Sequence, residues 1–209
     1  MAMKQRRIGL TGGIASGKST VGQLLTVHFD LPVLDADAYA REALAPGTAA
    51  TAAVLARYGA AVAAAPAIDR AAVERAAIDR LALGRLVFAD AAERQWLEAL
   101  IHPLVRQRFS AELARLSEAP VLVLMIPLLF EAGLQDLCSE VWLVSCGEAE
   151  QVRRLIERDG LSEAAARQRL AAQWPLARKQ ALADRLIAND GSREELLAEL
   201  GRALVARAV

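Results

Sequence analysis

The sequence predicts an α/β fold in which helices cover both faces of a parallel sheet, and three observations predict it. A glycine-rich loop near the N-terminus joins an apolar run to a segment of helical periodicity. Further apolar runs of strand length recur along the chain, and segments of helical periodicity separate them. Strands that alternate with helices favour a doubly wound parallel sheet. With 209 residues, 55% of them hydrophobic, we expect one domain with its own core.

Five short apolar runs are the candidate strands. They are continuous rather than alternating, as expected of strands that are covered on both faces. The fifth run is weaker than the others, but it also closes just before a turn-forming Asn-Asp-Gly sequence. The runs lie at residues 7–11, 31–34, 121–126, 141–144 and 185–188.

Helices are expected between these strands, and their spacing is uneven. A first helix over residues 19–29 should place Val21, Leu24, Leu25 and His28 on its inner face. More than eighty residues then separate the second and third strands, far more than one crossover helix requires. We therefore predict a helical insertion at about residues 38–118, beside the carboxyl ends of the strands where α/β proteins bind ligands. Its helices are expected near residues 48–58, 70–83, 91–100 and 103–116.

The C-terminal part of the chain has two further helical regions. Residues 148–182 are helical in pattern and rich in arginine. A last helix is expected to begin at Ser192, because Glu195 completes a capping box with it. Its leucines form an apolar stripe, which indicates packing rather than function.

The loop at residues 12–19 fits the pattern G-x-x-x-x-G-K-[ST]. Glycines let backbone N–H groups close around an anion, and the start of the following helix adds partial positive charge. Lys18 would reach the outer phosphates of a nucleoside triphosphate, and the Ser19 hydroxyl would ligate Mg²⁺. The alternative is a glycine-rich turn with an exposed lysine. A strand before the loop and a helix after it favour the phosphate site.

Two carboxylates, Asp35 and Asp37, directly follow the second strand. At positions i and i+2 of an extended segment they point the same way. A kinase needs an acid at such a place to orient or deprotonate the acceptor hydroxyl. The alternative is that one of them caps the next helix, a common use of Asp. One Asp can cap while the other acts, and we expect Asp37 to be the chemical one.

A small-molecule kinase fits this chain better than a switch or a motor. The sequence contains no N/T-K-x-D motif of the kind that reads a guanine base. The apolar run 121–126 ends in Pro127 rather than in an acidic metal ligand, and the next acid is Glu131. The acids of the reaction must therefore come from elsewhere.

Seven basic residues lie within thirty positions of the arginine-rich region, and a closing lid could supply such groups to a transferring phosphoryl. They are Arg153, Arg154, Arg158, Arg167, Arg169, Arg178 and Lys179. Acidic residues interleave with them, so an ordinary solvated face explains most. Arg154 is the candidate for chemistry. His102 precedes Pro103, and considered on its own it is expected to be a helix-boundary residue.

Charge and cysteine content limit the binding partners and the cellular compartment expected of the protein. Lys plus Arg and Asp plus Glu are equal at 25 each, so no net field attracts nucleic acid or an anionic membrane. Cys138 and Cys146 have neither C-x-x-C nor zinc spacing, which favours reduced thiols and a cytoplasmic protein. No apolar run approaches the ~20 residues of a membrane span.

Several motifs occur together in one order along nearly the whole chain. They are Thr11-Gly12-Gly13-Ile14, Asp35-Ala36-Asp37 with Ala40-Arg41, Ile101-His102-Pro103, Pro127-Leu128-Leu129-Phe130-Glu131, Gln151 with Arg154, and Ala183-Asp184 with Asn189. The phosphate loop alone is generic, but the later blocks in this order are specific. The series resembles the dephospho-coenzyme A kinase family.

The resemblance implies transfer of the γ-phosphoryl of ATP to the ribose 3′-hydroxyl of dephospho-CoA, with Mg²⁺ as cofactor, as the last step of coenzyme A synthesis. It implies a P-loop NTP hydrolase-like fold of the nucleoside-monophosphate-kinase kind, with a helical substrate domain and a helical lid. Catalysis would fall to Lys18, Asp37 and Arg154. The ATP phosphates would be held by Gly13, Ile14, Ala15, Ser16, Gly17, Lys18, Ser19 and Thr20. The acceptor would be bound by Asp35, Arg41, His102, Pro127, Leu128 and Glu131.

Two positions depart from the family pattern. Ala15 stands where the family more often has glycine, and a small side chain should fit unless the position needs a positive φ. Met125 stands where many relatives place an acid, so it offers no metal ligand. Two other functions remain open from the residues alone: a kinase for a nucleotide or sugar-like acceptor, and an ATP-binding module without catalysis. The retained Lys18, Ser19 and Asp37 argue against the second.

Overall fold

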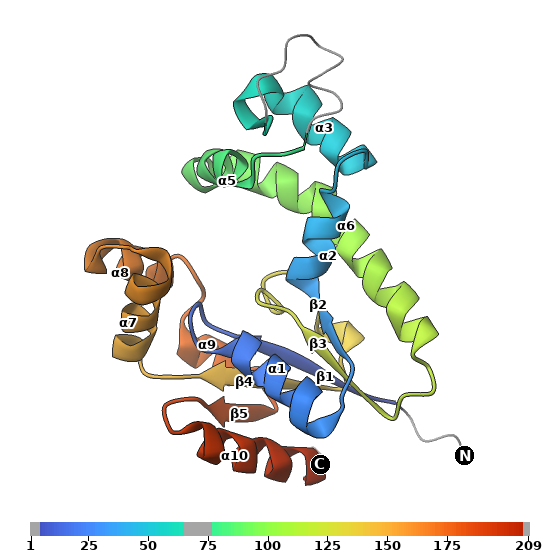
Figure 1. The fold of residues 1–209 in the computed structure, drawn as a ribbon, viewed down its shortest axis with the longest axis vertical. Coiled ribbons are helices and arrows are strands. Elements are labelled where there is room, and N and C mark those ends of the chain that lie inside the picture. The colour runs from blue at the N-terminus through green and yellow to red at the C-terminus, as the bar shows by residue number, and fades with distance from the viewer. Residues whose placement is uncertain (1–4, 65–76, 207–209) are drawn as a thin grey trace. The chain divides into compact units, whose positions relative to one another are not determined.

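The computed structural model describes residues 5–64 and 77–206, and it contains a five-stranded parallel sheet in the order β2-β3-β1-β4-β5 (Figure 1). The predicted α/β fold is confirmed, and each predicted strand is present. The strands are β1 (Arg6–Gly12), β2 (Val33–Asp35), β3 (Val121–Met125), β4 (Glu140–Ser145) and β5 (Arg185–Ala188).

The chain divides into two compact units. One contains the sheet and comprises the residues up to Asp35 together with those from Arg115 onward, and the other comprises Ala36–Ala114. The sheet unit carries α1 (Lys18–Phe29), α7 (Glu148–Asp159), α8 (Glu163–Ala171), α9 (Leu176–Gln180), α10 (Arg193–Val205) and the 3₁₀ turn η2 (Gln135–Leu137). The helical unit carries α2 (Ala36–Ala43), α3 (Ala49–Tyr58), η1 (Gly59–Val62), α5 (Arg80–Ala89) and α6 (Ala91–Arg115).

One face of the sheet is covered by α1 and α10. Alternate residues of four strands, among them Ile8, Val123 and Trp142, form a buried cluster with Leu24 of α1 and Leu200 of α10. Because strand side chains alternate between faces, these residues fix which face the two helices cover. The capping box predicted for Ser192 and Glu195 is present at the start of α10.

His28 is the one member of the predicted inner face of α1 that points the other way. Val21, Leu24 and Leu25 are buried, but His28 is exposed in the last turn of the helix. The prediction that it faces the core was wrong. The imidazole is polar, so exposing it in the last turn of the helix carries no hydrophobic penalty.

The helical unit has a core of its own, formed by residues of α3, η1, α5 and their neighbours, among them Val54, Val62 and Leu83. The predicted helix at 48–58 is present, with Thr48 as its N-cap. The prediction of a helix at 70–83 lies partly outside the described residues. Its described end differs, because Asp79 caps α5 and that helix runs on to Ala89.

Pro103 does not separate two helices, as we had expected from the sequence. Instead α6 is one helix of 25 residues with Pro103 inside it. Proline removes one helical hydrogen bond and crowds the preceding turn. Buried Ile101 and Val105 flank it, so packing on both sides of the proline outweighs that cost. Among the described helices, none is both long enough and apolar enough to cross a bilayer.

Candidate active site

The glycine-rich loop leads from the carboxyl end of β1 into the first turn of α1. Gly17 is the N-cap of α1 and has φ of +92°, a conformation that favours glycine. The backbone amides at the helix start, together with its partial positive charge, suit an anion. A cavity of about 500 Å³ opens here, lined by residues 15–20 of the loop and helix and by Arg154, Glu157 and Arg158 of α7.

Close approach of other side chains restricts this loop as strictly as its dihedral angles do. A Cβ atom on Gly17 would lie 1.9 Å from Nδ2 of Asn189, and one on Gly13 would lie 2.7 Å from Nε2 of Gln151. Both contacts are shorter than atoms can approach. The glycines therefore let side-chain amides reach the loop backbone, in addition to permitting its turns.

Ala15 occupies the left-handed region, with φ of +57°. The condition under which we expected alanine to be unfavourable at this position is thus met. A non-glycine residue there costs about 1–2 kcal/mol. Part of that cost is offset because Ala15 and Ile14 pack against a cluster formed by Val152, Leu155 and Ala166 of α7 and α8.

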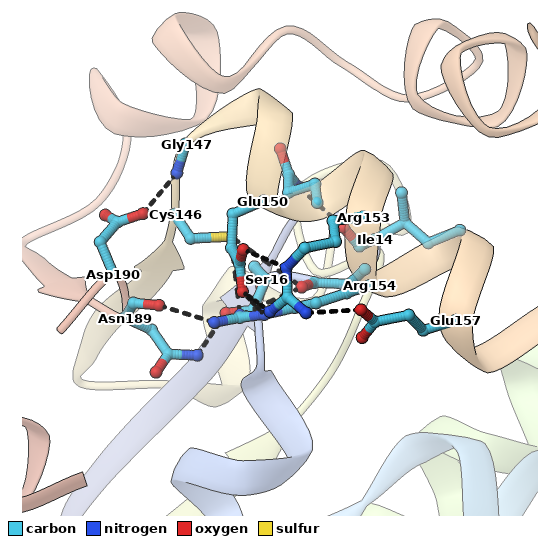
Figure 2. A network of polar contacts seen from close by, with 12 residues as sticks. Ile14, Ser16, Cys146, Gly147, Glu150, Arg153, Arg154, Glu157, Asn189 and Asp190 are labelled. Atoms are coloured by element: carbon cyan, nitrogen blue, oxygen red, sulfur yellow. Dashed lines mark hydrogen bonds and ion pairs between the residues drawn. The ribbon is translucent and has the colours of Figure 1, made fainter. Parts of the chain in front are cut away.

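Hydrogen bonds from Asn189, which follows β5, and from Arg154 of α7 hold the backbone of the phosphate loop (Figure 2). Nδ2 of Asn189 donates to the Ser16 carbonyl oxygen at 2.8 Å. Arg154 donates through Nη2 to the Asn189 carbonyl oxygen at 3.0 Å and through Nη1 to that of Ala15 at 3.4 Å. Its Nε pairs with Glu150 at 2.7 Å. Arg154 is therefore held at the cavity by three different groups.

Asn189 was not among the site residues predicted from the sequence. Its position immediately after β5 was the available signal, because the carboxyl ends of parallel strands are where ligands bind in such folds. The side chain is buried and donates into the loop, so it supports the conformation of the phosphate site.

The other arginines of the region differ from Arg154. Arg153 pairs with Glu150 and Glu157 at 2.6 Å each. Three further arginines also pair with carboxylates on the surface: Arg158 and Arg169 with Asp159, and Arg167 with Glu148 and Glu163. A solvated face with surface ion pairs accounts for these residues, as the interleaved acids suggest.

Among the ionisable groups near the loop, the Glu150 carboxyl and the Cys146 thiol have perturbed pKa values. Hydrogen bonding from Arg153, with a further contribution from Arg154, lowers the pKa of the Glu150 carboxyl to about 2. Burial raises the pKa of the Cys146 thiol. Cys138 and Cys146 are both free thiols, and the buried surroundings of Cys138 raise its pKa to about 12. Neither thiol is poised as a nucleophile.

The chemistry of the cavity fits a magnesium ion bound together with phosphates. Ser19 lies on the cavity with its side chain exposed. Within residues 5–64 and 77–206 there is no cluster of three or more His, Cys, Asp or Glu that could hold a metal. Mg²⁺ commonly takes one or two protein ligands and completes its shell with phosphate oxygens and water. Ser19 could be such a single ligand.

The predicted acceptor residues of the sheet unit lie at the ends of β2 and β3. Asp35 is the last residue of β2. Pro127, Leu128 and Glu131 belong to the turn that follows β3, and Oγ1 of buried Thr11 donates to the Pro127 carbonyl oxygen at 3.1 Å. Thr11 thereby connects this turn to the entry of the phosphate loop.

The remaining predicted residues lie in the helical unit. Asp37 is in the first turn of α2 and Arg41 in its last turn, so four positions separate them and they share a helix face. His102 is half-buried on α6, one residue before Pro103. The structure thus groups residues 15–20 of the predicted phosphate site with Arg154 around one cavity, whereas Gly13 and Ile14 do not line it. Asp37, Arg41 and His102 lie on the other unit.

A family model described as dephospho-CoA kinase matches residues 6–195. The chain belongs to the dephospho-CoA kinase family. The dephospho-CoA kinase of Parasynechococcus marenigrum strain WH8102 is 59% identical over 198 residues, which cover 95% of this chain and 94% of the relative. That of Synechococcus sp. strain CC9605 is 62% identical over 189 residues, covering 90% and 86%. A crystal structure from Thermus thermophilus has a TM-score of 0.76 at 39% identity, covering 96% and 97%.

Membership in the dephospho-CoA kinase family confirms the resemblance found in the sequence. It also agrees with the sheet order and the phosphate loop described above. Dephospho-CoA kinases match this chain in sequence over nearly its full length, and the Thermus thermophilus structure matches it in fold over a similar share.

Proposed function

We propose that this protein transfers the γ-phosphoryl group of ATP to the ribose 3′-hydroxyl of dephospho-CoA, giving coenzyme A and ADP as the last step of coenzyme A synthesis. The observation that carries the proposal is the phosphate loop with Arg154 at its cavity, in a chain of the dephospho-CoA kinase family. The two cysteines, read as reduced thiols, favour a cytoplasmic enzyme, and the balanced charge of the chain favours one that binds neither nucleic acid nor membranes.

On the donor side, we assign the ATP phosphates to the residues from Gly13 to Thr20. Backbone N–H groups of the loop and the start of α1 would bind the β- and γ-phosphates. The Lys18 ammonium would lie against the outer phosphates, and the Ser19 hydroxyl would ligate Mg²⁺. When bound, Mg²⁺ neutralises charge that builds up on the phosphate oxygens. Support comes from the left-handed Gly17 and from the cavity that residues 15–20 line.

On the acceptor side, we assign the helical insertion at about residues 38–118 to substrate binding. Asp37 would accept the proton of the 3′-hydroxyl or orient that hydroxyl for attack. The hydroxyl oxygen forms the new bond to the γ-phosphorus as the bond to the β-γ bridging oxygen of ATP breaks. The acceptor would be lined by Asp35, Arg41, His102, Pro127, Leu128 and Glu131.

Arg154 would stabilise the charge that spreads over the transferring phosphoryl group. A guanidinium group can contact two phosphate oxygens at once, which suits the planar transition state. Arg154 is held at the cavity by Glu150 and by two carbonyl oxygens, so little ordering remains to be done when ATP binds. We assign residues 148–182 to the lid that carries it.

The experiment that tests the proposal is ADP release from ATP and Mg²⁺ with four acceptors: dephospho-CoA, AMP, CMP and adenosine. We expect turnover with dephospho-CoA alone, with coenzyme A identified as the product by mass spectrometry. Turnover with a different acceptor would retain a kinase but reject this substrate. ATP binding without turnover on any acceptor would instead indicate a binding module, and an Asp37→Ala variant that still supports growth would agree with it.

A further inference from the structure

One short segment of the sheet unit contacts both loops that the proposed reaction uses. Its first residue, Gln173, follows α8, and its last, Lys179, lies in α9 six positions later. Gln173 contacts the phosphate loop, and Lys179 contacts the turn after β3. We call residues 173–179 the linking segment.

At the first end, Oε1 of Gln173 accepts a hydrogen bond from the Ile14 backbone N–H at 2.9 Å. The carbonyl oxygen of Ile14 accepts a hydrogen bond from Nε2 of Gln151 at 2.7 Å. Both polar groups of the Ile14 backbone are thus held by side-chain amides. Because Ile14 precedes the left-handed Ala15, these bonds fix the loop where its backbone is least favourable.

At the other end, Nζ of Lys179 pairs with Oε1 of Glu131 at 2.8 Å. The Lys179 side chain is only 1% exposed, which is exceptional for lysine. A buried ammonium is stable only beside an opposite charge, and among the described residues its ion-pair partner is Glu131. The pair therefore fixes Glu131, and with it the turn that begins at Pro127.

The segment between these contacts is built to be stiff. Pro175 is the N-cap of α9, and proline has a restricted φ angle. The Arg178 guanidinium stacks on the Trp174 ring, with 3.3 Å between its Cζ and the ring centroid. α9 also contacts β4, so the segment rests on the sheet.

We propose that Gln173 and Lys179 are positioning residues, Gln173 for the loop that binds ATP and Lys179 for the turn that binds the acceptor. The proposal rests on the proposed function, because that function makes the turn after β3 part of the acceptor site. We assign neither residue a contact with substrate. Each acts through the loop that it holds.

The test is a crossed pattern in steady-state kinetics of the full-length protein. Gln173→Leu removes the acceptor for Ile14 N–H, and we expect KM for ATP to rise about five-fold, the usual worth of one hydrogen bond, with KM for dephospho-CoA unchanged. Lys179→Met frees Glu131, and we expect KM for dephospho-CoA to rise about ten-fold, as for a bond to a charged group, with KM for ATP unchanged. Gln168→Leu, an exposed glutamine on α8, is the matched control and should change neither.

Lys179→Met leaves a carboxylate buried without a partner, and that alone destabilises a fold. The double variant Lys179→Met/Glu131→Gln removes both charges and should unfold at the same temperature as the wild type. Glu131 is itself assigned to the acceptor site, so Glu131→Gln alone is the reference, and we expect the double variant to have a higher KM for dephospho-CoA than Glu131→Gln. Equal KM values in these two variants would show that Lys179 serves stability alone and would overturn the proposal.

Other outcomes also decide the matter. If Gln173→Leu and Lys179→Met raise both KM values equally, the linking segment has no separate effect on the two loops and the proposal is wrong. If the wild-type protein itself forms no coenzyme A, the proposed function fails first and this inference fails with it. The two failures are distinguished by whether the wild type turns over.

Discussion

The two faces of helix α7 carry the same kind of side chain with different consequences. Arg154, on the face toward the phosphate loop, is 28% exposed and donates to two carbonyl oxygens of the surrounding backbone. Arg153, the preceding residue, is 57% exposed and pairs with two carboxylates on the surface. Arg154 has one carboxylate partner, Glu150, beside its two neutral carbonyls, and so it keeps more of its positive charge at the cavity than Arg153, which lies between two carboxylates. The position of an arginine on the helix, rather than the richness of the region in arginine, decides its value for phosphate binding.

The largest effect should come from the loop that Arg154 faces. In the proposed reaction the Lys18 ammonium lies against the outer phosphates, so for Lys18→Ala we expect kcat/KM to fall about a thousand-fold, or about 4 kcal/mol of transition-state stabilisation. Steady-state kinetics with dephospho-CoA measures it, with thermal unfolding as the control for folding. Near-normal turnover would mean that this loop does not bind the triphosphate.

A matched pair of variants tests the difference between Arg154 and Arg153. Arg154→Ala should lower kcat about a hundred-fold, because the proposed reaction then loses one preorganised donor to the transferring phosphoryl group. Arg153→Ala should leave kcat within about two-fold, since an exposed ion pair contributes little. Equal losses in both variants would contradict the distinction between the two faces.

The Ala15→Gly variant tests whether backbone strain or side-chain packing dominates at Ala15 in the phosphate loop. Glycine relieves the left-handed strain but loses the packing of a methyl group on α7 and α8 and gains freedom in the unfolded chain. The strain is the larger quantity, and we expect the free energy of unfolding to rise by about 0.5 kcal/mol. Chemical denaturation measures the difference, and a loss of more than about 1 kcal/mol would show that packing outweighs strain here.

The smallest effect concerns Glu150, which bonds to the arginines of both faces. Its pKa of about 2 lies below the ordinary 4.5, so its stabilising contribution is present above pH 4.5 and is lost as the pH falls toward 2. Hydrogen bonding from Arg153 is the largest cause. In Arg153→Ala the carboxyl pKa should therefore move up toward 4.5, as followed by ¹³C NMR titration, whereas Gln168→Leu should leave it in place.

Much of the fold could be predicted because its signals are local in the sequence. The phosphate loop, each of the five strands and the cap of α10 depend on residues a few positions apart. Arg154 could be singled out by its place after a strand. The sequence did not indicate that α6 continues through Pro103, because packing of Ile101 and Val105 determines the outcome there.

The supports of the site could not be predicted in the same way. Gln173 and Ile14 are 159 positions apart, and Asn189 and Ser16 are 173 apart. No periodicity or spacing rule relates residues at such separations, and only the folded sheet brings them together. The interleaved acids predict a solvated cation at Lys179, but its side chain is buried, because burial depends on what packs around a short helix.

The insertion between β2 and β3 has a consequence for how such a fold can change. The two strands are neighbours in the sheet, with Val33 opposite Val123, although the whole helical unit lies between them in the sequence. Closing a chain segment becomes costlier only with the logarithm of its length, by about 0.6 kcal/mol for each doubling. Shortening, lengthening or replacing the helices of that unit therefore leaves the sheet and its phosphate loop almost as stable as before. A scaffold of this kind could be given a new acceptor unit by grafting between Asp35 and Arg115 without redesign of its nucleotide site.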